Sequence, residues 1–157
     1  MNMKRGLMIL SLGAAVALGG FGSGQAFFNS PLAANSHYRP INFGMGYEMY
    51  VDLSSLETVK DDGQGWTFKV NLFRSPEDSG NIEGTYTLTY KVAHGQAWLY
   101  NDSTHSWQEI PMRKKEIKHN QIADFVAVNL CYKQKTGQYL NDDYGYAKGM
   151  ERYYKGE

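Results

Sequence analysis

The chain has 157 residues, and its 16 Lys and Arg balance 16 Asp and Glu, so the formal charge at neutral pH is zero. This balance gives no electrostatic case for binding to nucleic acid, for which a strongly basic face would be expected, and none for binding to anionic membranes. The single cysteine excludes an internal disulfide framework, so stability has to come from packing, for which the aromatic content of 14% provides material.

The first 26 residues have the pattern of a signal peptide. Lys4 and Arg5 precede an uncharged apolar stretch over residues 6–21, and Ala26 supplies a small residue for cleavage before Phe27. An uncleaved anchor is the alternative, but the apolar stretch is short for a membrane span of about 20 residues. We therefore predict an exported protein of the periplasm, cell surface or extracellular space, with no membrane span after cleavage. The mature chain would carry a charge of roughly −2.

Residues 27–45 contain two prolines and several Asn and Ser without a sustained period, which predicts a leader that either lies along the domain or stays mobile. The period-two pattern of a strand starts at Tyr47. In the segment YVDLSSLE, Asp52 is expected to end this strand in an Asx turn, and Ser54 with Glu57 forms a capping box for a short helical turn. A Ser–Asp hydrolase site is the alternative, but no histidine lies nearby in sequence to act as a base.

Further strands are predicted with short turns between them. The segments are WTFKVNLF (66–73), TYTLTYKV (85–92), AWLY (97–100) and WQEI (107–110), and the last two form a hairpin. Alternation places Trp66, Phe68, Val70, Leu72, Tyr86, Leu88, Tyr90 and Val92 on the buried face. Successive strands without helices between them indicate an antiparallel meander.

After Pro111 the period changes to that of a helix. Asn120 is the predicted cap, apolar residues follow at 3–4 spacing, and Gly137 marks the stop. A strand over residues 126–130 is the competing interpretation, which the caps and the acid-first, base-last order disfavour. The sequence thus predicts an α+β fold over residues 46–137, an antiparallel β-sheet meander of about five to six strands with one C-terminal helix packed on it.

No arrangement of residues in the sequence indicates catalysis. The histidines are His37, His94, His105 and His119, and none has the spacing of a helical metal site. Asp102 with His105 supplies at most two metal ligands. Cys131 has no neighbouring base, and a small buried apolar role is favoured over pairing between chains. We predict a protein that is not an enzyme and that uses no metal and no cofactor.

Two motifs stand in the same order as in a known family. The first is YVDLSSL (50–56), followed by an acidic Gly turn and a Trp/Phe/Val strand, and the second is WQEIP (107–111) before IADFVAVNLC (122–131). Together they resemble the bacterial surface-adhesin protein E-like family of small exported proteins, over about residues 47–132. The resemblance implies an antiparallel sheet with a helix across it, a cell-envelope location and, for some members, adhesion to host matrix proteins. The second cysteine that often pairs with the helix cysteine in that family is missing here.

Binding is the function that this pattern favours, with a protein or glycan partner at the cell surface. The candidate contact residues are Trp98, Tyr100 and Trp107 in the hairpin, and Tyr144, Tyr146, Tyr153 and Tyr154 in a Tyr-rich extension over residues 138–157. Tyr and Trp contact partners well at low entropic cost. A docked or frayed terminus is the alternative interpretation of the extension. A small apolar ligand held between sheet and helix is the alternative function, and a homodimer is left open.

Overall fold

A computed structural model of the chain describes residues 30–113 and 115–155. The predicted signal peptide and its cleavage site lie outside these residues. The strands are β1 (Tyr38–Gly44), β2 (Tyr47–Asp61), β3 (Trp66–Pro76), β4 (Gly84–Ala93), β5 (Gln96–Asn101) and β6 (Ser106–Ile110). The helices are α1 (Ile122–Thr136) and α2 (Tyr146–Lys155), with two short 3-10 turns, η1 (Pro31–Ala34) and η2 (His119–Gln121).

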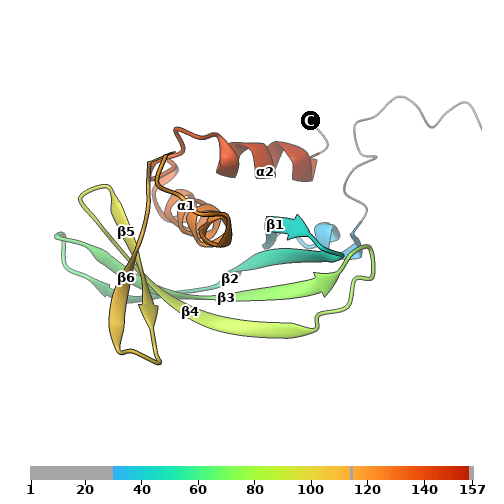
Figure 1. Cartoon of the computed structure of the whole chain (residues 1–157), viewed down its shortest axis with the longest axis horizontal. Coiled ribbons are helices and arrows are strands. Elements are labelled where there is room, and N and C mark those ends of the chain that lie inside the picture. Colours follow the sequence, from blue (N-terminus) through green and yellow to red (C-terminus); the bar gives the residue numbers. More distant parts are fainter. Residues whose placement is uncertain (1–29, 114, 156–157) are drawn as a thin grey trace, which may run out of the picture.

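The six strands form one antiparallel sheet in the order β1-β2-β3-β4-β5-β6, so each strand pairs with its neighbour in sequence. The sheet curls, α1 lies in its hollow, and α2 lies on the side of α1 away from the sheet (Figure 1). The predicted α+β fold, an antiparallel meander with a C-terminal helix packed on it, is confirmed. The second helix is an addition to that prediction.

The inner face of the sheet, toward α1, carries the core. The predicted inward residues of β3 are all buried: Trp66, Phe68, Val70 and Leu72. Tyr90 and Val92 of β4 are buried as well, whereas Tyr86 at the start of this strand is 49% exposed. The alternation therefore identifies the correct face of β4, but burial extends over the second half of the strand only.

The segment YVDLSSLE does not end a strand, because β2 continues through it to Asp61. The register between β2 and β3 shifts between Asp52 and Glu57, which marks a bulge. The predicted Asx bond is present, since the Asp52 carboxylate accepts the Ser54 backbone N–H at 2.9 Å. The predicted capping box is wrong. A bulge kept within a long strand preserves the pairing with β3 that a helical turn would break.

Ser55 holds this bulge in the sheet. Its hydroxyl donates to the Asp52 carbonyl at 2.6 Å and accepts the backbone N–H of Asn71 on β3 at 2.8 Å. The side chain thereby replaces the backbone acceptor that the bulge removes from the ladder.

We expect Ser55→Ala to lower the free energy of unfolding by about 1–3 kcal/mol, because it leaves the Asn71 N–H in a part-buried position without its acceptor. Ser54→Ala is the matched control, since Ser54 is exposed and its hydroxyl only reaches the neighbouring Asp52 carboxylate. It should change stability by less than about 0.5 kcal/mol. Urea denaturation of both variants measures the difference, and equal effects would show that Ser55 has no special role.

Part of the predicted leader is an edge strand. Tyr38–Gly44 forms β1 and pairs with β2, and both Pro40 and Ile41 are fully buried. Proline lacks the N–H that a central strand would need, so an edge position tolerates it. The Pro and the irregular register around it conceal the strand's alternation in the sequence. The folded domain therefore begins before residue 46.

Helix α1 ends where predicted but is buried on more than one side. Gly137 adopts a left-handed conformation (φ 81°) and its N–H bonds to the Lys133 carbonyl. Asn120 lies in the turn η2 and does not cap α1, whose first flanking residue is Gln121. Every residue from Phe125 to Cys131 is buried, because the sheet covers one side of the helix and α2 the other.

Candidate binding surface and helix–sheet cavity

The four tyrosines predicted as contacts in the C-terminal extension pack against the domain. Tyr144 and Tyr146 stack on each other with ring centroids 5.2 Å apart, and both rings meet Phe125 of α1 edge-on. Tyr153 stacks on Phe43 of β1, and the Tyr154 hydroxyl donates to the Ala33 carbonyl. These rings attach α2 to the domain, which is the docked-terminus interpretation of the extension.

A further polar contact fastens the same region. Lys133 of α1 forms an ion pair with Glu151 of α2, and the Tyr139 hydroxyl bonds to both. Burial acts against ionisation of Glu151, but hydrogen bonds from Lys133 and Tyr139 leave the pKa of this carboxyl below its ordinary value. Glu151 therefore stays charged at neutral pH and keeps the two helices joined.

The three aromatic residues predicted in the hairpin come together on the outer face of the sheet. Ala97 points into the core, so Trp98 and Tyr100, which alternate with Ala97 and Leu99 along β5, point outward. Trp107 on β6 is the direct cross-strand partner of Tyr100 and shares its face. Their rings meet edge-on with centroids 5.2 Å apart, and Trp107 is 39% exposed.

Lys91 of β4 completes this surface. It is the cross-strand partner of Trp98, and its ammonium nitrogen lies 5.1 Å from the Trp98 ring centroid and 5.9 Å from that of Trp107. A cation over two ring faces restrains both rings. We call Lys91, Trp98, Tyr100 and Trp107 the outer aromatic patch.

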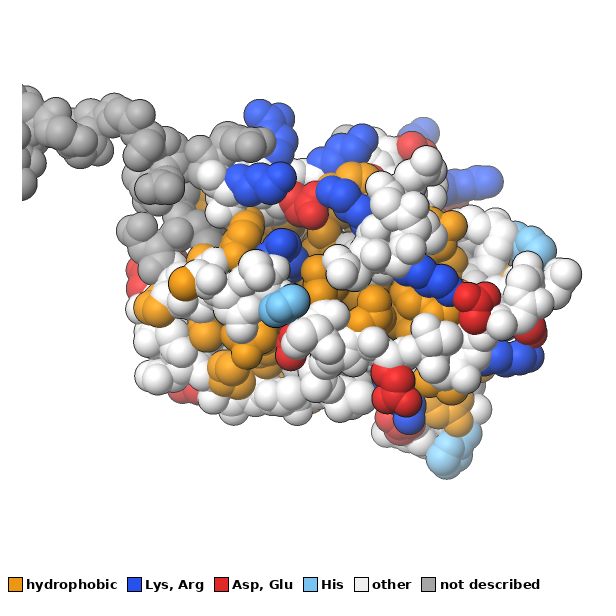
Figure 2. Space-filling model, turned by 180° about the vertical axis from the view of Figure 1, so that it is seen from behind, with side chains coloured by type: hydrophobic (Ala, Val, Ile, Leu, Met, Phe, Trp, Pro, Cys, Tyr) orange, Lys and Arg blue, Asp and Glu red, His pale blue; other side chains and the backbone are white. Residues whose placement is uncertain are grey.

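A groove of about 490 Å³ adjoins the outer aromatic patch. Its polar lining residues are Lys60, Asp62, Gln64, Thr67, Lys91 and His94, and Trp98 and Trp107 form its aromatic wall. Lys60 and Asp62 neutralise each other in an ion pair at 2.7 Å. Seen from behind the view of Figure 1, Lys and Arg side chains gather mainly along the upper edge of the molecule, on the side of the helices, and Asp and Glu side chains are scattered among exposed hydrophobic ones (Figure 2).

The polar half of the groove was not predicted from the sequence. Cross-strand pairing brings Lys60, Thr67, Lys91 and Trp98 into one row across β2, β3, β4 and β5. Thr67 and Lys91 occupy outward positions of the predicted strands. Which residues become their neighbours depends on the register of each strand pair, and the sequence does not give that register.

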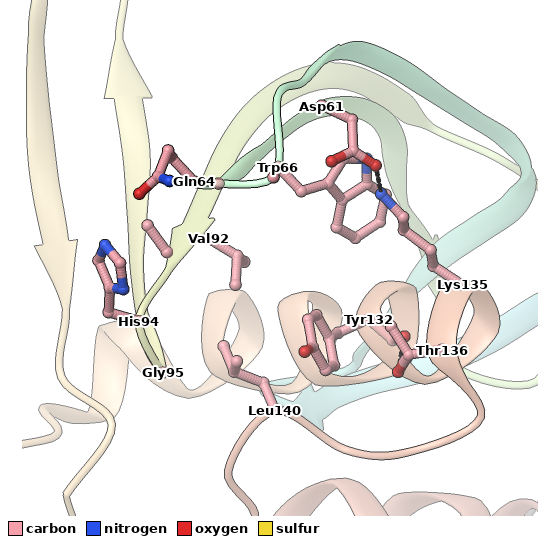
Figure 3. Close-up of a pocket in the computed structure, with 13 residues that line it drawn as sticks. Asp61, Gln64, Trp66, Val92, His94, Gly95, Tyr132, Lys135, Thr136 and Leu140 are labelled. Atoms are coloured by element: carbon pink, nitrogen blue, oxygen red, sulfur yellow. Dashed lines mark hydrogen bonds and ion pairs between the residues drawn. The ribbon is translucent and has the colours of Figure 1, made fainter.

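A second cavity, of about 330 Å³, lies between the inner face of the sheet and the end of α1. Trp66 and Asp61 lie on one side of it and Tyr132 and Leu140 on the other, with Val92 pointing into the space between them (Figure 3). Gln64, Gly65, Ala93 and His94 line both this cavity and the outer groove, so the β2–β3 and β4–β5 turns form the wall between them.

The residues considered for catalysis are not brought together into a reactive site. His37, His94, His105 and His119 are all exposed, and across residues 30–113 and 115–155 no three His, Cys, Asp or Glu side chains could hold one metal ion. Cys131 is fully buried, and burial raises the pKa of its thiol far above the ordinary value, so it is neither nucleophilic nor accessible for pairing between chains. None of the described helices is long and apolar enough to cross a membrane.

The partly buried Asp124 has a structural explanation. The Tyr90 hydroxyl on β4 donates to the Asp124 carboxylate in the first turn of α1 at 2.7 Å. Burial raises the pKa of Asp124 above its ordinary value, and the Tyr90 hydrogen bond opposes that rise. The pair joins the start of the helix to the sheet.

Comparisons with protein families, with curated proteins and with solved structures find no match to this chain. The geometry of the outer groove and of the inner cavity is therefore the basis for assigning a function.

Proposed function

We propose that this is a non-enzymatic, exported envelope or cell-surface protein that binds a neutral glycan in the groove beside the outer aromatic patch. The observation that carries the proposal is the convergence of Trp98, Tyr100 and Trp107 on one open face next to a polar groove. Export is supported by the signal-peptide pattern of residues 1–26. The adhesin-like motifs agree with a binding role at the cell surface.

The chemistry of the groove suits a sugar. The apolar C–H face of a pyranose ring can lie on an indole, while its hydroxyls need polar partners around the rim. Trp98 and Trp107 supply the ring faces, and Gln64, Thr67 and Asp62 supply acceptors and donors. Because Lys91 restrains the two indoles, the site is preorganised and loses little entropy on binding.

The charge of the groove favours a neutral glycan over a polyanion. Lys60 is paired with Asp62, and Glu109 is the cross-strand neighbour of Trp98, so basic groups do not dominate. A polyanion would be repelled by the two acids as well as attracted by Lys60 and Lys91. A protein partner would meet a mixed rim of this kind too, and the experiment below separates the two classes.

The test is a binding screen of the purified protein against immobilised neutral oligosaccharides (β-glucan, chito-oligosaccharide and galactan fragments), with heparin and matrix proteins as contrasts. We expect saturable binding to a neutral oligosaccharide. Trp98→Ala and Trp107→Ala should each weaken it at least about tenfold, because each removes a ring face.

Tyr86→Ala is the matched control, since Tyr86 is an aromatic residue that is 49% exposed and does not line the groove. It should leave glycan affinity unchanged. Saturable binding to heparin or to a matrix protein alone would overturn the neutral-glycan proposal. Binding to a neutral oligosaccharide that both Trp variants retain would overturn the assignment of the site.

A further inference from the structure

The cavity between sheet and helix is a second site, separated from the proposed glycan groove by the β2–β3 and β4–β5 turns, which line both. Its lining is mixed: Trp66 and Val92 from the sheet are almost completely buried and face the half-buried Tyr132 of α1 and Leu140 of the following loop, and Gln64 and His94 add polar groups. Trp66 is held in place because its indole N–H donates to the Thr58 hydroxyl at 3.0 Å. A volume of about 330 Å³ is at the lower end of small-molecule sites.

One end of the cavity carries an ion pair. The Lys135 ammonium of α1 contacts the Asp61 carboxylate at the end of β2, and it lies 4.4 Å from the centroid of the Trp66 ring (Figure 3). Hydrogen bonding from Lys135 holds the pKa of Asp61 below its ordinary value, so the carboxylate is charged at neutral pH. Both side chains remain partly exposed, at 31% and 46%, so a ligand can reach their charged ends although each is paired with the other.

We propose that this cavity binds a free α-amino acid with an aromatic or branched apolar side chain. Its carboxylate pairs with Lys135, its ammonium pairs with Asp61, and its side chain lies against the half-buried Tyr132 and Leu140.

The adjacent opposite charges select a zwitterion. A net cation would pair with Asp61 and be repelled by Lys135. A net anion would pair with Lys135 and be repelled by Asp61. A hydrocarbon would contact Tyr132 and Leu140 but gain nothing at the charged end. A zwitterion engages both charges at once, through two charge-assisted hydrogen bonds.

Isothermal titration calorimetry with three probes of one shape tests the proposal. L-Phenylalanine carries both charges, phenethylamine lacks the carboxylate, and 3-phenylpropionate lacks the ammonium. We expect L-phenylalanine to bind saturably and the other two to bind at least about tenfold more weakly, because each loses one charge-assisted contact. Equal affinity for the three probes, or no saturable heat with either L-phenylalanine or L-leucine, would overturn the proposal.

Variants locate the site. Lys135→Met keeps the aliphatic stem over Trp66 and removes the charge, and Asp61→Asn keeps the shape of the carboxylate. Each should weaken L-phenylalanine binding at least about tenfold, with thermal unfolding confirming that the variant is folded. Trp107→Ala, on the other side of the sheet, should leave this binding unchanged while it weakens glycan binding. Unchanged L-phenylalanine affinity in both cavity variants would contradict the assignment.

Discussion

Truncation of the chain after Gly137 is expected to lower the free energy of unfolding by more than about 3 kcal/mol, or to prevent folding at ordinary temperature. Helix α2 packs on α1 and β1, and its Ala147 is fully buried. Removing it exposes Phe125, which is otherwise completely shielded, to water. Thermal and urea unfolding of the truncated and complete chains measure the loss.

The double variant Tyr153→Ala, Tyr154→Ala is the control for this truncation. It removes the ring contacts of α2 with Phe43 and with η1 but keeps Tyr144, Tyr146 and the buried Ala147. It should destabilise the protein by clearly less than the truncation. If the truncated chain unfolded at an unchanged temperature, residues 138–157 would instead be a separate extension. The composition of these residues is compatible with that outcome.

Asn129→Ala is expected to cost about 2–4 kcal/mol of unfolding free energy, the largest effect that we assign to a single polar side chain. Asn129 is fully buried in α1. Its amide donates to the Phe125 carbonyl at 3.0 Å, and its oxygen accepts the backbone N–H of Asn141 at 3.0 Å. The substitution leaves that N–H unpaired and opens a void beneath the loop that leads to α2.

Gln134→Ala is the matched control, because Gln134 is an exposed amide on the same helix. It should change stability by less than about 0.5 kcal/mol. Hydrogen exchange adds a local measurement: in Asn129→Ala the amides of α2 should lose protection before those of β3. Equal losses of stability in the two variants would show that Asn129 is an ordinary helix residue.

The seven predicted contact residues fall into two groups. The three in the hairpin lie on an open face of the sheet, and the four tyrosines of the C-terminal extension pack against the domain. All seven are aromatic and polar-tipped, so the sequence could not distinguish a tyrosine that packs against Phe125 from one on an open face. The hairpin residues Trp98, Tyr100 and Trp107 lie on strands whose alternation sets their face. The residues of the C-terminal extension have no clean period, and only their contacts with α1 and β1 reveal their role.

The sequence by itself determined the features that depend on local pattern: the buried faces of β3 and of the second half of β4, the meander, the stop of α1 at Gly137 and the α+β class. Each of these follows from a period of two or 3.6 or from the conformational freedom of glycine. The local pattern gave a wrong prediction at YVDLSSLE. Its capping-box residues predict a helical turn, but they lie in a bulged strand because pairing with β3 outweighs that preference.

Only the tertiary structure decided the features that depend on contacts between distant segments. These include the pairing of β1 despite Pro40, the use of Ser55 as a substitute acceptor for Asn71, and the docking of α2 on α1. Both proposed sites belong to the same group. Cross-strand register places Lys91 over Trp98, and the packing of α1 brings Lys135 to Asp61, 74 residues away in sequence. Neither contact can be read from the linear sequence, because the first is set by strand register and the second by how the curled sheet closes around the helix.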